Sequence, residues 1–477
     1  MKSTKPHVAL LASPGMGHLI PVLELAKRLV SHQSFKVTVF VVATDHASIA
    51  NSQLLQSPSA SNDLLDMVLL PFIDISNIVE PDASFVTKIV ILMLESLPFL
   101  RSEISKMEFR PTALVVDLFG TDAWEIADEF NMLKYVFIAS NAWFLAVILH
   151  GPEIDRKEVD DHVKNQKPLN IPGCKPVKLE DTLDVFLTDP NGPFYQGFVG
   201  SGMKMALADG ILMNSWEGLE PTTLKALGDA KKVPVYPIGP LVRPVEKPVL
   251  GNQVINWLDK QPKESVIYVS FGSGGTLSAQ QVLELAWGLE LSQQRFLWVA
   301  RPPLENDASG YFFTVGNGSD GTPDYLPDGF LARTQDKGLV VSMWAPQVEV
   351  LSHPSVGGFL THCGWNSVME SIINGVPMIA WPLYSEQKMN AALLTEEFGA
   401  SIRAKAMELD GLVGREEIKS MVRRILIDSE GQNIRARIKG LKNSAAKALT
   451  EGGSSYNSLS QVAEICIQHL KTKSYGA

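Results

Sequence analysis

Residues 344–387 read WAPQVEVLSHPSVGGFLTHCGWNSVMESIINGVPMIAWPLYSEQ, and this stretch indicates the fold class of the chain. Its apolar run Val356–Leu360 predicts a buried strand, a glycine-bearing turn follows it, and Trp365–Asn374 has a helical pattern. A helix that starts after a buried strand presents backbone N–H groups and the positive end of its dipole to an anion. The stretch therefore predicts a site for a phosphorylated ligand with flat and polyhydroxylated parts.

The same alternation of short apolar strands and amphipathic helices runs through both halves of the chain. Strands are predicted at His7–Ala12, Lys36–Val42, Ala113–Val116, Tyr135–Ile138 and Gly210–Met213, and then at Val266–Phe271, Phe296–Ala300, Leu339–Met343, Val356–Leu360 and Pro377–Ala380. Helices are predicted between them, for example at Leu19–Val30 and Gln280–Leu291. Continuously apolar strands alternating with helices indicate parallel sheets covered on both faces. We expect an α/β protein of two Rossmann-like lobes facing across a cleft.

The boundary between the lobes is expected in the proline-rich segment Val233–Pro248, which favours an extended connector. Residues 1–240 would form the N-terminal lobe and residues 241–457 the C-terminal lobe, with an amphipathic helix at about 458–477 packing back on the first lobe. Two polar segments, Val159–Pro176 and Pro302–Asp328, are predicted to be loops. Ligands of such sheets bind beyond the carboxyl ends of the strands.

Composition excludes several classes of partner. The net charge of -10 over 477 residues, without a basic stripe, argues against nucleic acid. The three cysteines are far apart in the sequence, which favours neither a disulfide framework nor a zinc site and fits a reducing cytosol. No apolar run is long enough for a membrane span, and the short N-terminal run is broken by Pro14. We therefore expect a cytoplasmic protein, and we expect it to be a monomer.

Several motifs together resemble those of plant UDP-dependent glycosyltransferases that act on small secondary metabolites. Residues 344–387 resemble the signature box of that family, and the similarity extends to SPGMGHLIP (13–21), PTALVVDLFGTDA (111–123), VYPIGPL (235–241) and SVIYVSFGSGGTLS (265–278). SPGMGHLIP, VVDLFGTDA and FGSGGTLS look most like the branch that glucosylates phenylpropanoids, monolignols and simple phenols. The resemblance implies a GT-B fold, with the acceptor bound by the N-terminal lobe and the nucleotide sugar by the C-terminal lobe.

His18 and Asp117 are the predicted catalytic pair. His18 lies in the turn after the first strand, where an imidazole can take a proton near neutral pH, although a local role at a helix start is the alternative. Asp117 ends an apolar strand, and its alternative role is a helix N-cap. The resemblance places His18 on the family's base and Asp117 on its orienting partner, and it leaves Asp122 as an ordinary first-turn carboxylate. The implied reaction is an inverting displacement that gives a β-glucoside and releases UDP.

A second group of residues is predicted to bind the UDP-sugar. It comprises Ser273, Trp344, Ala345, Gln347, His362, Trp365, Asn366, Ser367, Glu370, Glu386 and Gln387. Trp344 can stack on uracil, with Ala345 and Gln347 at the uracil edge; His362, Asn366, Ser367 and Ser273 suit the diphosphate, Glu370 the ribose, and Glu386 and Gln387 the sugar. Taken alone, Trp344 could be a core residue, Ser273 part of a plain turn and Glu370 a solvated helical residue.

The donor and the absence of a cofactor follow from the same motifs. The chain contains no Asp-x-Asp motif, so we expect neither a metal nor another cofactor, with the helix dipole and His362 in the metal's role. In the resembled family a terminal Gln, here Gln387, accompanies UDP-glucose. Trp365, where an arginine would suit a glucuronic acid donor, argues against UDP-glucuronic acid, and xylose and galactose donors stay open.

The acceptor site is predicted in outline. Phe119, Ser140, Trp143, Phe144 and Tyr384 are its candidate residues, with core packing an equal alternative for each aromatic ring. Among other functions, a Rossmann oxidoreductase would have Gly-x-Gly-x-x-Gly after the first strand, but the chain has GMGHLI at 15–20. A non-catalytic UDP-sugar binding protein would be expected to lack His18 or Asp117. Other donors and terpenoid or flavonoid acceptors stay open.

Overall fold

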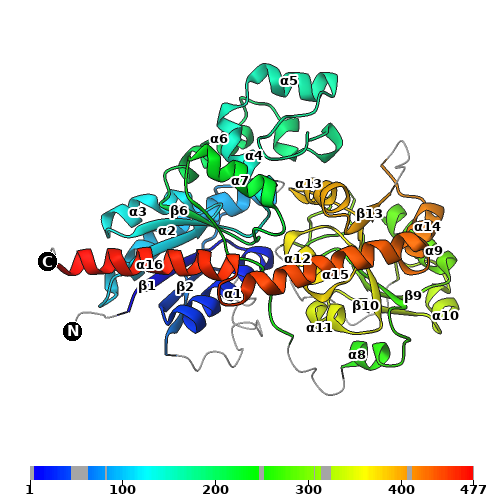
Figure 1. Ribbon diagram of the computed structural model, residues 1–477. Coiled ribbons are helices and arrows are strands. Elements are labelled where there is room, and N and C mark those ends of the chain that lie inside the picture. The colour runs from blue at the N-terminus through cyan, green and yellow to red at the C-terminus, as the bar shows by residue number, and fades with distance from the viewer. Residues whose placement is uncertain are drawn as a thin grey trace. The chain divides into compact units, whose positions relative to one another are not determined.

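The computed structural model describes residues 5–43, 63–80, 83–245, 252–305, 307–312, 324–404 and 411–475. These residues belong to two compact units, each built on its own parallel sheet (Figure 1). Unit 1 contains the described residues within Met1–Leu179, Val185–Leu241 and Lys447–Ala477. Unit 2 contains those within Glu180–Asp184 and Val242–Ala446. Part of the predicted loop Pro302–Asp328 and the end of the predicted connector lie outside the described residues.

The described part of unit 1 has a seven-stranded parallel sheet in the order β3-β2-β1-β4-β5-β6-β7. The strands are β1 His7–Ala12, β2 Lys36–Val42, β3 Leu65–Leu70, β4 Ala113–Asp117, β5 Leu133–Ile138, β6 Gly210–Met213 and β7 Val235–Pro237. Every side chain of β1 and of β4 is buried, as expected of strands covered on both faces.

Helices cover the sheet of unit 1 and include one from the end of the chain. They are α1 Met16–Gln33, α2 Phe85–Lys106, α3 Trp124–Glu129, α4 Ala142–His150, α5 Arg156–Asn165, α6 Pro193–Met205, α7 Pro221–Ala230 and α16 Ser454–Tyr475. Leu459, Val462 and Cys466 of α16 lie in the same hydrophobic core as α1 and β1. The predicted loop Val159–Pro176 was wrong in its first part, because α5 starts at the N-cap Asp155, whose carboxylate accepts from Lys157 N, and continues to Asn165.

The described part of unit 2 has a six-stranded parallel sheet in the order β10-β9-β8-β11-β12-β13. The strands are β8 Val266–Ser270, β9 Arg295–Ala300, β10 Gly338–Ser342, β11 Val356–Thr361, β12 Met378–Ala380 and β13 Ser401–Arg403. The helices are α8 Gln253–Leu258, α9 Ala279–Ser292, α10 Phe330–Thr334, α11 Gln347–Ser352, α12 Trp365–Asn374, α13 Gln387–Ala392, α14 Arg415–Leu426 and α15 Ser429–Leu449, and a π-helical turn, η6, spans Leu393–Glu397. The prediction of two Rossmann-like parallel sheets is confirmed.

In both sheets the strand order reverses next to the first strand of the sheet. In unit 1 the chain proceeds from β1 to β2 on one side of β1 and later places β4 on the other side. In unit 2 it proceeds from β8 to β9 on one side of β8 and later places β11 on the other side. Open α/β sheets bind ligands beyond the carboxyl ends of the strands at such a switch point. The turns after β1, β4, β8 and β11 are therefore the places to look for functional side chains.

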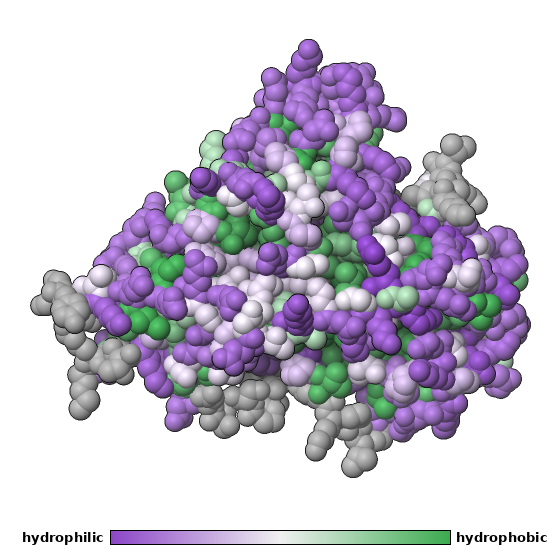
Figure 2. Space-filling model, viewed as in Figure 1, coloured by the Kyte–Doolittle hydropathy of each residue, from purple (hydrophilic) through white to green (hydrophobic). Residues whose placement is uncertain are grey.

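Hydrophilic residues cover most of the face seen in Figure 2, with hydrophobic residues interspersed among them. Such scattered apolar residues are ordinary on a protein surface. Within the described ranges, none of the helices combines the length and the apolar composition that crossing a bilayer would require.

Candidate active site

The switch point of unit 1 brings His18 and Asp117 together. His18 lies in the first turn of α1, and Asp117 is the last residue of β4. Since β1 pairs with β4 from Val8–Ala113 to Leu11–Val116, the turns that follow these strands are neighbours. His18 Nδ1 lies 3.1 Å from Asp117 Oδ2, with 18% of the histidine side chain exposed and 2% of the aspartate. A buried carboxylate thus fixes one ring nitrogen of a histidine that solvent can reach.

Asp117 also accepts hydrogen bonds from residues on both adjoining turns. Ser13 donates to it twice, from its hydroxyl at 2.6 Å to Oδ1 and from its backbone N–H at 3.1 Å to Oδ2. The Phe119 N–H donates to Oδ1 at 3.1 Å. These bonds satisfy a buried charge and orient it. The alternative N-cap role for Asp117 is not seen, because the 3-10 turn Thr121–Ala123 has Gly120 at its N-cap and no side-chain cap there.

Sequence reasoning did not single out Ser13, although it opens the motif SPGMGHLIP and directly follows β1. The signal that could have identified Ser13 is its hydroxyl at the carboxyl end of β1, next to the strand that ends in the predicted catalytic residue Asp117. Asp122, expected to be an ordinary carboxylate, pairs with Lys204 on the surface.

The predicted acceptor residues of unit 1 differ in their surroundings. The Phe119 ring lies 5.5 Å from the His18 ring, centroid to centroid, so it borders the catalytic pair. Phe144 is half-buried in the first turn of α4, whose N-cap Asn141 accepts from Phe144 N. Trp143 is buried, as the core-packing alternative expects. Ser140 is also buried, and its hydroxyl has no hydrogen-bond partner among the described residues.

The switch point of unit 2 is occupied by His362, which directly follows β11. A Cβ atom added at Gly272, in the turn after β8, would lie 2.4 Å from His362 Cε1, and one added at Gly364 would lie 2.4 Å from Nε2. Glycine at both positions therefore lets backbone from two turns approach the imidazole closely. Cys363 is buried with a left-handed φ of 66°, and its carbonyl accepts a hydrogen bond from Asn390 Nδ2 at 2.8 Å.

His362 is a neutral imidazole in this environment. Burial, and secondly the positive charge of Arg301, lower the pKa of His362 to about 3. Its Nδ1 has no hydrogen-bond partner among the described residues. A buried ring nitrogen without a partner, next to the N-terminus of the ten-residue helix α12, is suited to a polar ligand. His362 can donate or accept one hydrogen bond there, but it brings no formal positive charge.

Gln347 connects the predicted ribose and phosphate residues. Its Nε2 donates to Ser367 Oγ at 2.8 Å and to Glu370 Oε2 at 2.7 Å, and its Oε1 accepts from the Tyr268 hydroxyl at 3.3 Å. Glu370 is buried, so the alternative of a solvated helical residue is wrong. Burial raises the pKa of Glu370 to about 7, against the opposing hydrogen bond from Gln347. The side chain of Gln347, which is predicted at the uracil edge, orders Ser367 and Glu370.

Trp344 follows β10 and is 58% exposed, which does not fit the alternative of a core tryptophan. Met343 before it has a left-handed φ of 65°, and Trp344 N donates to Ser342 O at 2.7 Å. Ala345 is buried, and Ser273 is exposed in the turn after β8. Trp365 is buried and Asn366 follows it in the first turn of α12. A large, exposed aromatic ring on a constrained turn is available for stacking.

The loop before α13 carries the predicted sugar residues. Gln387 is buried, and its Oε1 accepts from the backbone N–H groups of Leu383 and Tyr384 at 2.9 and 3.1 Å. Its amide oxygen is therefore used within the loop. Glu386 is the N-cap residue of α13.

Asp184, which sequence reasoning missed, braces this loop from a segment some 200 residues earlier in the chain. Its carboxylate accepts from Ser385 N at 3.3 Å and from Lys388 Nζ at 2.8 Å, on either side of the predicted sugar residues. No feature of the sequence around Asp184 points to this contact.

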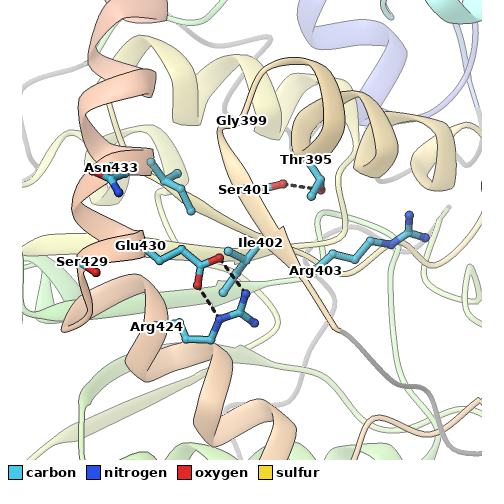
Figure 3. A pocket seen from close by; sticks show the side chains of 10 residues that line it. Thr395, Gly399, Ser401, Ile402, Arg403, Arg424, Ser429, Glu430 and Asn433 are labelled. Carbon is cyan, nitrogen blue, oxygen red and sulfur yellow. Dashed lines mark hydrogen bonds and ion pairs between the residues drawn. The ribbon is translucent and has the colours of Figure 1, made fainter. Parts of the chain in front are cut away.

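A cavity of about 470 Å³ in unit 2 involves none of these residues. It lies beside the edge strand β13 and is lined by Thr395, Gly399, Ser401, Ile402, Arg403, Arg424, Ser429, Glu430, Asn433 and Ile434. Figure 3 shows Arg424 and Glu430 joined to each other and Arg403 directed away from that pair. The polar groups that line this cavity do not converge on one point, so we do not place the active site there. Within the described ranges, no group of three or more His, Cys, Asp or Glu side chains could hold a metal ion.

Known proteins resemble the chain over nearly its whole length. Residues 238–429 match the family model UDP-glucoronosyl and UDP-glucosyl transferase. UDP-glycosyltransferase 72E1 of Arabidopsis thaliana is 53% identical over 473 residues, which cover 97% of each chain. Hydroquinone glucosyltransferase of Rauvolfia serpentina is 44% identical, over 96% of this chain and 97% of its own. The crystal structure of TcCGT1 in complex with UDP has a TM-score of 0.91 and 45% identity and covers 98% of this chain and 100% of its own. The chain accordingly belongs to the plant UDP-dependent glycosyltransferases of the GT-B fold and is a UDP-glycosyltransferase.

Proposed function

We propose that this enzyme is an inverting O-glucosyltransferase that moves glucose from UDP-glucose to a hydroxyl of a small phenol. The observation that carries the proposal is the pair formed by His18 and Asp117, with 3.1 Å between Nδ1 and Oδ2. A partly exposed histidine oriented by a buried carboxylate is the arrangement that general-base catalysis needs.

In the proposed mechanism, Nε2 of His18 takes the proton of the acceptor hydroxyl. The acceptor oxygen then attacks the anomeric carbon of the sugar while the bond from that carbon to the UDP oxygen breaks, which inverts the anomeric centre. Asp117 keeps the proton of the neutral imidazole on Nδ1 and stabilises the imidazolium that forms. A phenol begins near pKa 10, so modest help from a base suffices.

The leaving diphosphate is proposed to be bound without a metal ion. The N-terminus of α12 offers backbone N–H groups and its dipole, and His362 Nδ1 is a buried ring nitrogen with no partner among the described residues. Ser367, Asn366 and Ser273 complete the proposed diphosphate site. Because His362 is neutral, its contribution is a directed hydrogen bond rather than a charge.

The other parts of the donor are assigned to the remaining predicted residues of unit 2. The exposed face of Trp344 is proposed to stack on uracil, with the Ala345 backbone at its edge, and Glu370 to accept hydrogen bonds from ribose hydroxyls. Glu386 and the Nε2 donor of Gln387 are proposed to bind the glucose hydroxyls. Trp365 is buried and would support the turn from within.

A phenolic acceptor is supported by a relative and by one ring contact. The hydroquinone glucosyltransferase of Rauvolfia serpentina is 44% identical to the chain, and hydroquinone is a simple phenol. The Phe119 ring beside His18 would contact a flat acceptor at the base, with Ser140, Phe144 and Tyr384 as further candidates. None of the three cysteines, all within the described ranges, forms a disulfide, which supports a reducing compartment such as the cytoplasm, and we propose that the enzyme acts as a monomer.

Incubating the purified enzyme with a panel of donors and acceptors tests the proposal. The donors are UDP-glucose, UDP-galactose and UDP-xylose, the acceptors are monolignols, hydroxycoumarins, flavonoids, simple phenols and terpenoid alcohols, and mass spectrometry detects the products. We expect β-glucosides of phenols, and no transfer by His18→Ala, which should still bind UDP. Transfer only to terpenoid alcohols would overturn the acceptor assignment. Unchanged turnover by His18→Ala would overturn the mechanism.

A further inference from the structure

Arg301 connects two turns of unit 2 that carry proposed donor residues. It is the first residue after β9, and in the sheet β9 lies between β8 and β10. Its Nη1 donates to Gly275 O at 2.9 Å, in the turn after β8. Its Nη2 donates to Met343 O at 3.1 Å, in the turn after β10. One planar guanidinium thus joins the turns on both sides of its own strand.

These turns are the ones proposed to bind opposite parts of the donor. The turn after β8 carries Ser273, and its Gly272 packs against the imidazole of His362. The turn after β10 carries Trp344, which follows the left-handed Met343 directly. The carbonyl oxygens that accept from Arg301, those of Gly275 and Met343, lie in the same short segments as the residues proposed to contact the diphosphate and the uracil.

Arg301 also supplies positive charge to this part of unit 2. Its charge is the second cause, after burial, of the lowered pKa of His362, so it acts on that imidazole directly. Burial lowers the pKa of Arg301, but an arginine stays protonated at neutral pH. Its Nε is buried and has no hydrogen-bond partner among the described residues. Arg301 thus brings a formal positive charge to the turn after β8, whose Gly272 packs against His362.

We propose that Arg301 is a positioning residue for the nucleotide. It fixes the turn after β8, proposed to bind the diphosphate, relative to the turn after β10, proposed to bind uracil. It also places a permanent positive charge beside the diphosphate. The inference rests on the donor assignment of the proposed function. An anion is repelled by carbonyl oxygens and attracted by N–H groups, so a turn binds phosphate better when its carbonyl is bonded elsewhere. Gly275 O is bonded in this way to Arg301.

Lysine would reproduce only part of this role. It carries the charge as a point on a flexible stem, whereas the guanidinium fork can donate in two fixed directions at once. Two nitrogens of the planar guanidinium donate in different directions, one to Gly275 O and one to Met343 O. An ammonium group is not pre-organised to make both hydrogen bonds. Arg301→Lys therefore keeps the positive charge but loses the pair of hydrogen bonds that bridges the two turns, whereas Arg301→Met loses both the charge and this bridge.

The test measures the affinities of UDP, UMP and uridine by calorimetry for the wild type, Arg301→Lys and Arg301→Met. Arg333→Met is the matched control, since Arg333 also forms a fork in unit 2, but to Glu290 on α9, which carries no proposed donor residue. For Arg301→Met we expect UDP to bind ~30- to 100-fold more weakly and uridine ~3- to 10-fold, as charge-assisted contacts exceed neutral ones. Arg301→Lys should recover much of the loss for UDP and little of the loss for uridine. Arg333→Met should bind all three ligands as the wild type does.

Equal UDP affinities for wild type and folded Arg301→Met, with melting checked by circular dichroism, would overturn the inference. An equal loss for UDP and uridine in both variants would overturn the charge component, and full recovery of both ligands by lysine would overturn the bridge. If Arg301→Met does not fold, Arg301→Lys alone decides, since unchanged uridine affinity in it refutes the bridge. A wild type that binds UDP but glucosylates no phenol would refute the proposed function and leave the comparison of affinities intact.

Discussion

Replacing Asp117 with asparagine tests the catalytic pair with almost no change in side-chain shape. Oδ1 of Asp117 accepts from Ser13 Oγ and Phe119 N, while Oδ2 accepts from Ser13 N and faces His18 Nδ1. Each carboxylate oxygen therefore faces one backbone N–H, which can only donate, and one side-chain group. This symmetry means that an amide cannot satisfy all of its neighbours in either orientation.

With the amide oxygen toward Phe119, the NH₂ group of asparagine faces Ser13 N–H and His18 Nδ1. The imidazole must then accept at Nδ1 and carry its proton on Nε2, so it cannot take a proton from an acceptor. With the amide reversed, the NH₂ group faces Phe119 N–H, the tautomer is preserved, and the charge that stabilises the imidazolium is still lost. Both orientations leave one buried donor unsatisfied, which should lower the free energy of unfolding by ~1–3 kcal/mol.

We expect kcat of Asp117→Asn to fall by ~10²- to 10⁴-fold, the range typical of a lost general base or of its orienting carboxylate. The assay is steady-state kinetics with UDP-glucose and the best phenol of the panel, together with calorimetry of UDP binding. The Kd of UDP should change by less than about 2-fold, because an interaction made only in the transition state alters kcat without altering ground-state binding.

Asp122→Asn is the matched control, since Asp122 lies five residues further along the chain and pairs on the surface with Lys204. Its kcat should stay near the wild-type value, because exposed ion pairs contribute little. A kcat of Asp117→Asn within about 3-fold of the wild type would show that Asp117 does not orient a catalytic base. A Kd of UDP that rises as much as kcat falls would show that Asp117 acts on the donor and not on the base.

Three further predictions concern unit 2. Burial raises the pKa of Glu370 from 4.5 to about 7. Ionised Glu370 therefore destabilises the folded state fully above pH 7, and this destabilisation disappears below pH 4.5, where the carboxyl is protonated in both states. In thermal unfolding, Glu370→Gln should therefore be more stable than the wild type by ~3 kcal/mol at pH 8 and equally stable at pH 4, and its affinity for UDP should be ~10-fold lower. Trp344→Ala should weaken uridine by ~5- to 100-fold in calorimetry, since base stacking contributes ~1–3 kcal/mol, and unchanged affinity would exclude stacking. Gln387→Ala should raise KM for UDP-glucose by ~10-fold with little change in the Kd of UDP, and an equal change in both would contradict the sugar assignment.

Continuously apolar strands were predictable from the sequence, including the edge strand β10 and the three-residue strand β12, whereas β3, β7 and β13 were not. β1 and β4 are continuously apolar because helices cover both faces of the sheet, and such runs are read directly. β3 is an edge strand with exposed side chains such as Asp66, so its pattern resembles a loop. β13 has the sequence SIR, with a single apolar residue, and β7 lies within a proline-rich segment, so neither has an apolar run that indicates a strand.

The side-chain contacts that complete the site were not predictable, because they depend on tertiary geometry. Asp184 reaches Ser385 and Lys388 from a segment far away in the chain. The amide of Gln387 looked like a ligand group for sugar, but its oxygen is used within its own loop. A sequence motif identifies residue types and their order, and it does not indicate which atoms remain unbonded after folding.

The topology explains why His18 and Asp117, so distant in the sequence, could nevertheless be predicted as neighbours in space. A residue in the turn after β1 and one in the turn after β4 meet because β1 and β4 are adjacent and parallel, and the chain turns to opposite sides of the sheet from there. The same rule applies to Gly272 after β8 and His362 after β11, which are in close contact. It also applies one strand further along, where Arg301 after β9 reaches the turns after β8 and β10. In a parallel sheet, the position of a strand in the sheet order thus limits which turns a side chain can connect, and Arg301, on a strand between two turns proposed to bind the donor, can connect both.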